Sequence, residues 1–415
     1  MTQDLKKAYR TIMDDHFPER MEISFVFDDR RSTLIYEKVA WEIDGVRKGL
    51  RYGENPGQEA AFYKLVNGNL TVGEVTTIAP GRYLVSDAEL LQFGKHPGKI
   101  NLTDADNALN ILRYLMDRPT VAVMKHNNPS GVATADTIAE AYIKADLADH
   151  IAAFGGCIAL NRPVDLATAE AIAERYAEVV IAPEYEEGVV AVLAARKNLR
   201  IMRIGAIERL ATFAQERFVD FKSLIDGGVI AQLSFIPQTQ TAADFLPATI
   251  TRKGETYAVK RTPTAQEIED MLFGWKVEAG VTSNSVLYAK DGVTVGIGAG
   301  EQDRVGVAVI AKEKAYRNMA ESLAYTRYKN AYRFLDADKQ AEIDAEVAAA
   351  NGGLKDAAMI SDAFFPFRDG VDVGLREGVT AVIQPGGSLN DNEVIEAVNE
   401  AGATMVFTGQ RSFKH

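Results

Sequence analysis

The sequence has few of the residues that cross-link a chain or bind transition metals. Its 415 residues include a single cysteine, Cys157, and 5 histidines. One cysteine cannot form an internal disulfide, and it cannot supply a Cys-x-x-Cys zinc site. Disulfide scaffolds and zinc folds of that kind are therefore excluded, and the cysteine usage fits a reducing compartment. We expect a cytoplasmic protein.

An excess of positive charge and long apolar runs are also missing. Lys and Arg number 46 against 58 Asp and Glu, which gives a formal net charge of -12. This balance removes the long-range positive field that duplex nucleic acid or an anionic membrane requires. No stretch approaches the roughly 18 apolar residues of a membrane span, and the first residues lack the apolar core of a signal peptide. We expect a soluble protein with neither a nucleic-acid nor a membrane partner, in which any anionic ligand is held by locally placed Lys and Arg.

The composition that remains is that of a globular chain, with 47% apolar and 25% charged residues. A chain of this length is too long for one small core, so two to three domains are expected. We see no short-period repeat and no low-complexity block. A soft boundary near residues 210–220 divides the chain into domains at 1–215 and 216–415.

Apolar runs that break into a turn and then into a helix recur along the chain. Strands alternating with helices in this way predict α/β layers with a mainly parallel or mixed sheet. The three clearest examples are a strand at 120–124 with a loop at 125–131 and a helix at 134–147, a strand at 157–160 with a helix at 166–175, and a strand at 380–384 with a turn at 385–388 and a helix at 391–400. Polar helices are also expected at 263–275 and within 312–350.

Lys125 and His126 stand where an apolar strand ends, the position at which α/β proteins usually present chemistry. A lysine can polarise an oxygen or hold a phosphate, and its charge keeps a neighbouring histidine available as a general base. An incidental surface Lys-His pair is the alternative. A deaminase-like zinc site is not supported, because Asn128 stands where such sites carry Glu and only one cysteine is present.

Four further segments carry polar or aromatic groups suited to a ligand, and each has a purely structural alternative. Arg51-Tyr52 could recognise a phosphate or form an ordinary turn. Ser283-Asn284-Ser285 precedes the glycine-rich run 294–300, which could admit a ligand or form a strand bend. The aromatic cluster 362–369 could pack against a heterocycle or lie in the core. The segment 411–415 could enter a site or be a frayed basic tail.

In this order, these segments resemble the AICAR transformylase portion of the bifunctional AICAR transformylase/IMP cyclohydrolase family. The resemblance runs from about Arg51 to His415. It is carried by seven collinear motifs: Leu50-Arg-Tyr-Gly-Glu-Asn-Pro56, Lys125-His-Asn-Asn-Pro-Ser-Gly131, Ala153-Phe-Gly-Gly156, Ser283-Asn-Ser285, Ile297-Gly-Ala-Gly300 with Arg304, Ser361-Asp-Ala-Phe-Phe-Pro-Phe-Arg-Asp369 and Arg411-x-Phe-x-His415.

The resemblance implies a fold of two cytidine-deaminase-like α/β domains with additional helices and without the deaminase zinc. It also implies a homodimer whose active sites form at the subunit interface. The family's cyclohydrolase domain would precede the matching region, and this sequence does not contain it. We therefore expect a stand-alone transformylase, with ring closure left to a separate IMP cyclohydrolase.

The reaction implied is transfer of the formyl group of 10-formyltetrahydrofolate to the 5-amino group of the carboxamide ribonucleotide AICAR. The products are FAICAR and tetrahydrofolate. The weakly nucleophilic amine must lose a proton as it attacks, and the formyl oxygen must gain negative charge. His126 is the candidate base, and Lys125 and Asn284 are candidates to stabilise the oxyanion and protonate the leaving nitrogen.

The same resemblance assigns binding residues one by one. The AICAR set is Arg51, Tyr52, Gly155, Glu178, Arg304, Phe364 and Arg411, with Arg51 and Arg411 best suited to the phosphate. The folate set is Val305, Asp369, Ser388 and Leu389, and a potassium ion is expected near Ser283, Ser285 and Asp362. Two departures stand out: Gly57 replaces a histidine found in many relatives, and Glu178 replaces an aspartate found in some while keeping the carboxylate.

Two other functions stay open at this stage. An ATP-dependent ligase that formylates AICAR from free formate is one, although no Gly-x-x-x-x-Gly-Lys-Ser/Thr loop is present. A non-catalytic AICAR-binding partner of a separate cyclohydrolase is the other.

Overall fold

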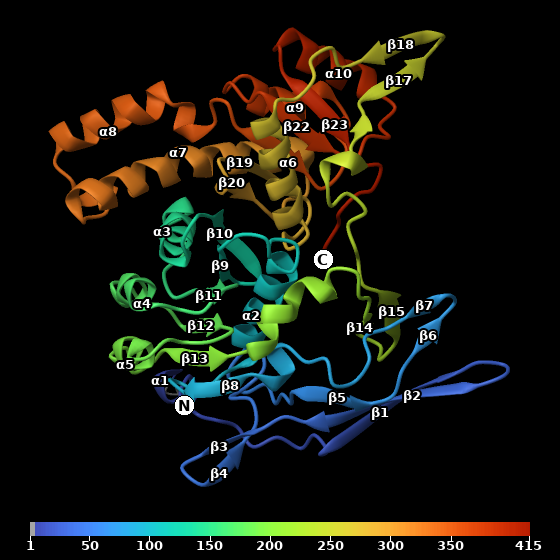
Figure 1. The fold of residues 1–415 in the computed structure, drawn as a ribbon, viewed down its shortest axis with the longest axis vertical. Helices are drawn as coiled ribbons and strands as arrows, with labels where there is room; N and C mark the ends of the chain where they lie inside the picture. The colour runs from blue at the N-terminus through green and yellow to red at the C-terminus, as the bar shows by residue number, and fades with distance from the viewer. Residues whose placement is uncertain (1–4) are drawn as a thin grey trace.

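A single 12-stranded mixed sheet runs through the computed structural model, which describes residues 5–415 (Figure 1). The strand order is β16-β23-β22-β21-β19-β20-β10-β9-β11-β12-β13-β8. The strands β11, β12 and β13 are mutually parallel, as are β21, β22 and β23, and the remaining pairings are antiparallel. The prediction of α/β layers around a mixed sheet is confirmed.

The sheet is built from two structural repeats that follow the same order of elements. In each repeat a helix leads into an antiparallel hairpin, and three parallel strands with their helices follow. The first repeat contains α2 (Lys99–Leu112), β9 (Thr120–Lys125), β10 (Asn128–Thr134), α3 (Ile138–Ala148), β11 (Cys157–Leu160), α4 (Leu166–Ala173), β12 (Val179–Ala182), α5 (Val189–Ala194) and β13 (Arg200–Arg203). The second contains α6 (Ala265–Glu278), β19 (Val286–Lys290), β20 (Val293–Gly298), α7 (Arg304–Tyr328), α8 (Ala337–Ala349), β21 (Ala358–Ser361), α9 (Arg368–Leu375), β22 (Ala381–Gln384), α10 (Asp391–Glu400) and β23 (Thr404–Phe407).

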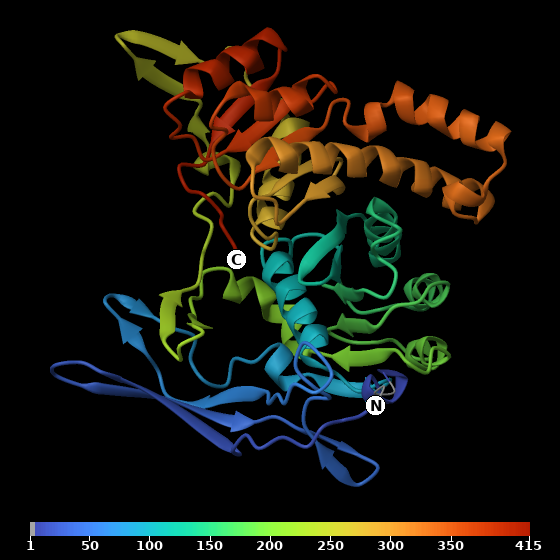
Figure 2. The same cartoon turned by 180° about the vertical axis from the view of Figure 1, so that it is seen from behind.

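The two repeats meet where β10 and β20 pair in antiparallel fashion, Ala133 opposite Val293. One face of the sheet carries α2 and α6, whose buried side chains share a single apolar core. The other face carries α3, α4 and α5 over the first repeat and α7, α9 and α10 over the second. The sheet and the helices on its two faces therefore form a three-layer sandwich, in which a pseudo-two-fold axis relates the two repeats (Figure 2).

The central strands form because their residues are apolar at successive positions. Strands β11, β12, β21, β22 and β23 are buried at every residue, as expected for strands covered by helices on both faces. Several helices begin at a capping side chain. Thr137 accepts from Glu140 N, Asp165 from Thr168 N and Asp303 from Gly306 N.

The rest of the chain supplies the two edge strands of the sheet, β8 and β16, and forms smaller units around it. Short helical elements are α1 (Leu5–Ala8), η1 (Val85–Asp87), η2 (Gly205–Phe213), η3 (Ala242–Asp244), η4 (Tyr332–Phe334) and η5 (Asn351–Gly353). The strands outside the repeats are β1 (Arg20–Val26), β2 (Arg31–Lys38), β3 (Trp41–Ile43), β4 (Val46–Lys48), β5 (Tyr63–Asn67), β6 (Thr71–Val72), β7 (Val75–Thr76), β8 (Glu89–Gln92), β14 (Val219–Ser223), β15 (Val229–Leu233), β16 (Leu246–Pro247), β17 (Thr249–Arg252) and β18 (Glu255–Ala258).

The hairpin between β9 and β10 corrects one expectation. Residues 125–131 were predicted to form a loop, but Asn128 pairs with Lys125 and β10 continues to Thr134. His126 and Asn127 have φ of 52° and 61°, which is the type I′ geometry that matches the twist of a hairpin. Because β10 continues to Thr134 and Thr137 caps the helix, α3 starts at Ile138 rather than at 134.

The glycine-rich run also has a structural explanation. A Cβ on Gly296 would lie 2.3 Å from Ala311 O, and one on Gly298 would lie 2.4 Å from Val307 O. Both oxygens belong to α7, so these glycines let a helix approach β20 and do not admit a ligand. The equivalent in the first repeat is Gly131, whose Cβ would lie 2.0 Å from Ala145 O of α3.

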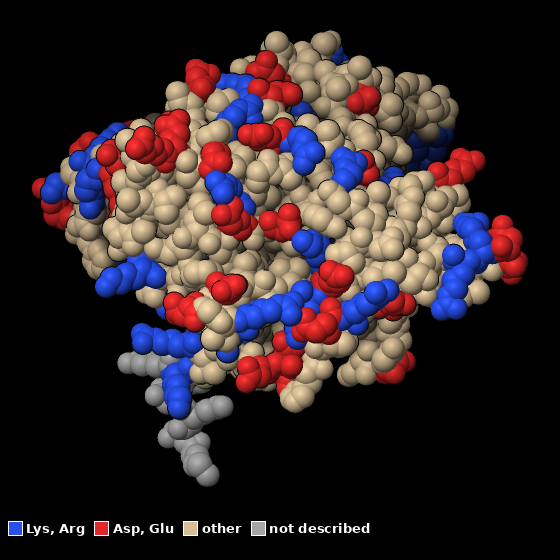
Figure 3. Space-filling view, turned by 60° about the horizontal axis from the view of Figure 1, so that its bottom comes forward, with Lys and Arg blue, Asp and Glu red and all other residues tan. Residues whose placement is uncertain are grey.

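Charge and hydropathy in the structure follow the composition. Within the part of the chain from residue 5 onward, no helix is both long and apolar enough to cross a membrane. On the face drawn in Figure 3, lysines and arginines are interspersed with aspartates and glutamates. Cys157 is buried in β11, where desolvation raises the pKa of its thiol well above the usual value.

Candidate functional site

Strand directions bring the predicted site residues of both repeats to one edge of the sheet. β9 and β19 run in opposite directions, because each is antiparallel to its hairpin partner and the partners β10 and β20 are antiparallel to each other. The carboxyl end of β9 and the amino ends of β11–β13 therefore share an edge with the amino end of β19 and the carboxyl ends of β21–β23. We call this edge the site edge.

The hairpin turn presents Lys125 and His126 at the middle of the site edge. His126 is exposed, and no hydrogen bond to its imidazole is formed by any residue from 5 to 415. Asn127 N donates to Asp104 Oδ1 at 2.6 Å, and Asn107 Nδ2 donates to Asn127 O at 2.8 Å. The direction of the imidazole thus depends on a turn that is anchored to α2.

Lys125 lies against the loop that precedes β11. Its Nζ donates to Gly155 O at 2.8 Å and to Phe154 O at 3.2 Å. Gly155 has φ of 70°, and a Cβ there would lie 3.2 Å from Lys125 Nζ and 3.2 Å from the Tyr176 ring. A side chain at this position would displace the lysine, so the close approach requires glycine.

A group of buried charges lies beyond Lys125, at the amino ends of β12 and β13. Arg51 and Arg200 are 7% and 1% exposed, and the Nε atom of each has no hydrogen-bond partner among residues 5–415. Burial, followed by the charge of Arg51, lowers the pKa of Arg200 to about 10, so the Arg200 guanidinium stays charged at neutral pH. Glu178 is the nearby carboxylate, 3.5 Å from Arg200 Nη1. Two buried cations facing one carboxylate leave positive charge for an anionic ligand.

Aromatic rings line the same region. Tyr52 is buried, and the Arg51 guanidinium lies 4.5 Å from its ring centroid. Phe154 is 56% exposed and packs on Tyr176 with a centroid separation of 5.3 Å. The exposed Phe154 and the partly buried Tyr176 beside buried arginines give the region an apolar wall next to its positive charge.

The second repeat contributes a compact network around Arg304, the first residue of α7. Its Nη1 donates to Ser285 O at 2.9 Å, to Ser361 Oγ at 3.0 Å and to the carboxylate of Asp362. Its Nη2 donates to Asn284 Oδ1 at 2.7 Å. Arg304 is 8% exposed, and both of its terminal nitrogens are engaged within the protein. In this structure Arg304 therefore orients Asn284.

Glu278, which the sequence analysis did not single out, lies beneath this network. It is fully buried at the end of α6, where its Oε1 accepts the hydroxyl of Ser285 and its Oε2 has no partner. Ser285 N donates to Asp362 Oδ2 at 3.1 Å. Burial raises the pKa of Glu278 well above its usual value, and the neighbouring Asp362 charge adds to the effect.

The predicted folate residues gather at the outer part of the site edge. Val305 lies in the first turn of α7, Asp369 in the first turn of α9, and Ser388 and Leu389 just before α10. Leu389 is 87% exposed. Phe364 lies in the neighbouring loop after β21 and is 40% exposed, whereas the adjacent Phe365 is fully buried in the core. The aromatic cluster is thus divided between core and surface.

The last residues of the chain run along the site edge and are not frayed. Ser412 N donates to Asp362 O at 2.8 Å, and Ser283 N donates to Lys414 O at 2.9 Å. Lys414 Nζ lies 3.3 Å from Asn127 O in the hairpin turn. The tail therefore connects the two repeats, and its end lies between them in Figures 1 and 2. Arg411 itself is exposed, with its guanidinium 4.6 Å from the Phe413 ring centroid.

The predicted AICAR residues fall into two separate groups along this edge. Arg51, Tyr52, Gly155 and Glu178 lie near β11–β13, whereas Arg304, Phe364 and Arg411 lie near β19 and β21. Strands β13 and β21 are seven positions apart in the sheet, about 34 Å at the usual strand spacing of ~4.8 Å. Arg51 and Arg411 of one chain therefore cannot hold the same phosphate.

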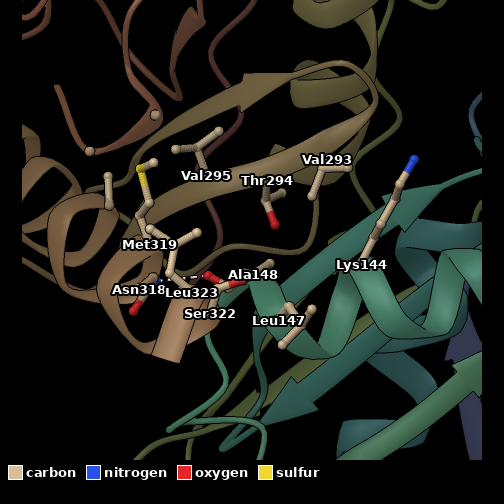
Figure 4. A pocket seen from close by; sticks show the side chains of 13 residues that line it. Lys144, Leu147, Ala148, Val293, Thr294, Val295, Asn318, Met319, Ser322 and Leu323 are labelled. Atoms are coloured by element: carbon tan, nitrogen blue, oxygen red, sulfur yellow. Dashed lines mark hydrogen bonds between the residues drawn. The ribbon is translucent and has the colours of Figure 1, made fainter. Parts of the chain in front are cut away.

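A separate cavity of about 290 Å³ lies between α3, β20 and α7. It is mostly apolar, and it contains none of the predicted site residues (Figure 4). Over residues 5–415, no group of three or more His, Cys, Asp or Glu side chains is placed to hold a metal ion.

Several side chains of the site were missed in the sequence. Arg200 is the first residue of a buried strand. No glycine or turn motif stands beside it in the sequence to mark it as a site residue. Asp104 and Asn101 lie within a helical pattern, Asn101 Nδ2 donating to Glu178 Oε2 at 3.2 Å. A polar residue at a position that helical periodicity assigns to the buried face is the one signal that marks Asp104.

Comparison with known proteins shows the family to which the chain belongs. A family model described as the AICARFT/IMPCHase bienzyme matches residues 8–314. The bifunctional purine biosynthesis protein PurH of Rhodospirillum rubrum is 40% identical over 371 residues, which is 89% of this chain and 60% of that protein. The PurH proteins of Ruegeria sp. and Aquifex aeolicus are 40% and 37% identical over 372 and 366 residues. The chain thus spans about 60% of the length of these curated relatives.

Proposed function

Because the chain belongs to the AICARFT/IMPCHase bienzyme family, we propose that it transfers a formyl group from 10-formyltetrahydrofolate to the 5-amino group of AICAR. The observation that carries the proposal is the site edge. There an exposed histidine on an anchored turn lies between a buried, positively charged region and the Asn284–Arg304–Asp362 network. The products are FAICAR and tetrahydrofolate.

In the proposed reaction the 5-amino nitrogen attacks the formyl carbon while His126 accepts its proton. A bond forms between that nitrogen and the carbon, and the formyl oxygen takes up the electron pair as an oxyanion. Lys125 and Asn284 stabilise this charge, because an ammonium group and an amide N–H can both donate to it. The bond from the carbon to N10 of the folate then breaks, and N10 receives a proton as it leaves.

Arg51 and Arg200 are proposed to hold the AICAR phosphate. Both are buried and charged, and each has a donor without a protein partner. Arg200 is an addition to the set that the resemblance implies. Tyr52, Gly155 and Glu178 would contact the rest of the nucleotide, and the side chain of Glu178 is 36% exposed and so accessible to it.

We propose that the working unit is a homodimer in which each site takes residues from both copies. The two AICAR groups lie beside β11–β13 and β19–β21, about 19 Å apart at their nearest strands and about 34 Å apart at their outermost ones, so one nucleotide cannot contact all of these residues in a single chain. Arg304, Phe364 and Arg411 of one copy would then face Arg51 and Lys125 of the other. The folate would lie with the former group, against Val305, Asp369, Ser388 and Leu389.

A potassium ion is part of the proposal, and the donors beneath Asn284 fit a monovalent cation. The hydroxyls of Ser283 and Ser285, the Asp362 carboxylate and the unpartnered Oε2 of Glu278 are oxygen donors, which hard cations prefer. When bound, the ion would balance negative charge there and hold the loop that carries Asn284. No zinc chemistry is proposed.

The finer organisation is proposed on the same basis. The two repeats would correspond to two cytidine-deaminase-like domains at 1–215 and 216–415 that share one sheet through β10 and β20. We propose that these residues carry the transformylase and not the cyclohydrolase, and that the reaction takes place in the cytoplasm. An assay of the chain with FAICAR tests whether these residues also carry the cyclohydrolase, and IMP formation would contradict the proposal.

The test of the function is formation of tetrahydrofolate from AICAR and 10-formyltetrahydrofolate by the full chain in potassium buffer. Replacing His126 with Ala should lower kcat by about 10²- to 10⁴-fold, the usual contribution of a general base. His16→Ala is the matched control, because His16 is exposed and pairs only with Glu59 in the part of the chain from residue 5 onward.

Three outcomes would contradict the proposal. Equal turnover by the two histidine variants would remove His126 from the mechanism. Tight binding of AICAR without turnover would favour a non-catalytic partner of a cyclohydrolase. Turnover that requires ATP and formate would favour a ligase.

A further inference from the structure

Asp104 of α2 is a buried carboxylate that holds the catalytic turn from below. It is 5% exposed, and its Oδ1 accepts the Asn127 N–H at 2.6 Å. One turn further along α2, Asn107 donates to Asn127 O at 2.8 Å. Both backbone polar groups of Asn127 are therefore bound by side chains of one helix.

The charge of Asp104 faces the site. Burial raises the pKa of its carboxyl, whereas the Asn127 N–H and the neighbouring charges of His126 and Lys125 oppose that shift. The Asp104 carboxylate is therefore close enough to interact electrostatically with Lys125 and His126.

The second repeat contains an equivalent hydrogen bond from its hairpin turn to a helix aspartate, but that turn carries no histidine. Asp270 is the sixth residue of α6 counted from Ala265, as Asp104 is the sixth of α2 counted from Lys99. Its Oδ1 accepts the Gly292 N–H at 3.1 Å, and Gly292 is the second residue of the equivalent two-residue turn. Asp291 and Gly292 have φ of 53° and 70°, so this turn is also type I′. In both repeats an aspartate of the preceding helix therefore anchors the hairpin turn.

What differs is the residue that the turn presents. His126 occupies the first position of one turn and Asp291 that of the other. Since no residue from 5 to 415 hydrogen-bonds the His126 imidazole, the ring is directed by the backbone of its turn alone. Lys125, by contrast, is also fixed through its own Nζ bonds to Phe154 O and Gly155 O.

We propose that Asp104 is a positioning residue of the transformylase site, which fixes the direction of His126 by binding Asn127 N–H. The inference rests on the proposed function. A displacement of about 1 Å in a reacting group can cost about 100-fold in rate, so the loss of this single bond should be visible in kcat.

The test compares Asp104→Ala, Asp104→Asn and Asp270→Ala in the full chain. Asp104→Ala should lower kcat by about 30- to 100-fold with KM for AICAR within about 3-fold, because ground-state binding does not use the imidazole. Asp104→Asn should stay within about 5-fold of wild type, since an amide oxygen can still accept the Asn127 N–H. Asp270→Ala should lower the Tm by a similar amount to Asp104→Ala and leave kcat unchanged.

A second measurement does not depend on turnover. Spectra of ¹⁵N-labelled imidazoles are simple to assign in a chain with 5 histidines, with His126→Gln identifying the relevant signal. The His126 signal should shift in Asp104→Ala and stay in place in Asp270→Ala. If Asp104→Ala does not fold, Asn107→Ala removes the other bond to Asn127 and should shift the same signal.

The outcomes separate the inference from the function. Normal kcat in a folded Asp104→Ala, or an equal loss of kcat in Asp104→Ala and Asp270→Ala, would overturn the positioning role. An unmoved His126 signal would overturn it as well. If the wild type shows no turnover, the proposed function fails, and the imidazole spectra still decide whether Asp104 directs His126.

Discussion

The two repeats share a scaffold to the level of single hydrogen bonds, yet only the first carries a buried arginine at the start of its third parallel strand, Arg200. Lys125 Nζ donates to carbonyls of the loop before β11, and Lys290 Nζ donates to Lys355 O before β21 at 2.7 Å. Arg200 N donates to Glu178 O, and in the equivalent place Thr404 N donates to Thr380 O. The charged pair of the first repeat is a pair of threonines in the second.

This difference distinguishes residues that stabilise the shared fold from residues that are suited to a ligand or to catalysis. Both repeats have an aspartate in the first helix, a lysine at the end of the first hairpin strand and a glycine in the second hairpin strand. Because these residues recur, we assign their contacts to stabilising the hairpin. Arg51, Arg200, Glu178 and His126 have no such counterparts. Lys125 belongs to both sets, because its backbone bonds are structural and its position beside His126 is suited to chemistry.

The largest effect is expected from shortening the tail that joins the repeats. Removing residues 411–415 takes away the bonds to Asp362 O, Ser283 and Asn127 O. Turnover should fall by at least about 100-fold, because the groups of both repeats lose their common support. Circular dichroism and Tm serve as controls for folding. Near-normal kinetics from the shortened chain would show that the repeats keep their site geometry without the tail.

Glycine replacements test the scaffold that the repeats share. Gly131→Ala and Gly296→Ala each place a Cβ within 2.0 and 2.3 Å of a helix carbonyl. Both should lower the free energy of unfolding by about 1–3 kcal/mol, the usual cost of overpacking, as measured by urea denaturation. Stability unchanged in one variant and lowered in the other would show that the repeats pack their helices differently.

Arg200 tests the charge that distinguishes the first repeat. Arg200→Met should raise the KM or Kd for AICAR by about 10- to 100-fold, the value of a charge-assisted hydrogen bond. Thr404→Val alters the equivalent position of the second repeat and should leave AICAR binding unchanged. Isothermal titration with AICAR measures both, and equal affinities for wild type and Arg200→Met would remove Arg200 from the phosphate site.

A smaller, pH-dependent effect is expected at the start of α6. Burial raises the pKa of Glu267, but Arg261, whose nitrogens lie 2.6 and 2.8 Å away, and Thr264 N outweigh it and bring the pKa to about 2. A lowered carboxyl pKa stabilises the folded state above the unfolded value of about 4.5, and this stability is lost as pH falls through about 2. Glu267→Gln should therefore cost about 1–3 kcal/mol at pH 7 and progressively less between pH 4.5 and 2.

The control for this titration lies in the first repeat. Asn101 occupies the matching position of α2, where its Oδ1 accepts Gly98 N at 3.0 Å and carries no charge. Asn101→Ala should lower stability by an amount that changes less with pH in that range, because Asn101 does not titrate and meets a carboxylate only through its Nδ2 bond to Glu178. Urea denaturation at pH 7, 4 and 3 measures both variants. A pH-independent loss in Glu267→Gln would show that the Arg261 pair contributes through its hydrogen bonds alone.

Much of the fold was predictable because buried strands can be recognised from short apolar runs in the sequence. Apolar runs such as 157–160 and 380–384 could only be strands or buried helix segments, and the flanking glycine and proline decided between them. The β9–β10 hairpin was not predictable in this way. His-Asn is not one of the common type I′ pairs, and Pro129 and Gly131 in the second strand suggested a loop.

The sequence by itself determined the α/β class and the order of the strands and helices within each repeat, because periodicity and turns act over a few residues. Only the tertiary structure decided that two repeats join through β10 and β20, that Arg200 and Asp104 lie at the site edge, and that the predicted AICAR residues fall into two groups along it. Those features depend on which strand ends share an edge, and strand order is set by packing between segments more than a hundred residues apart.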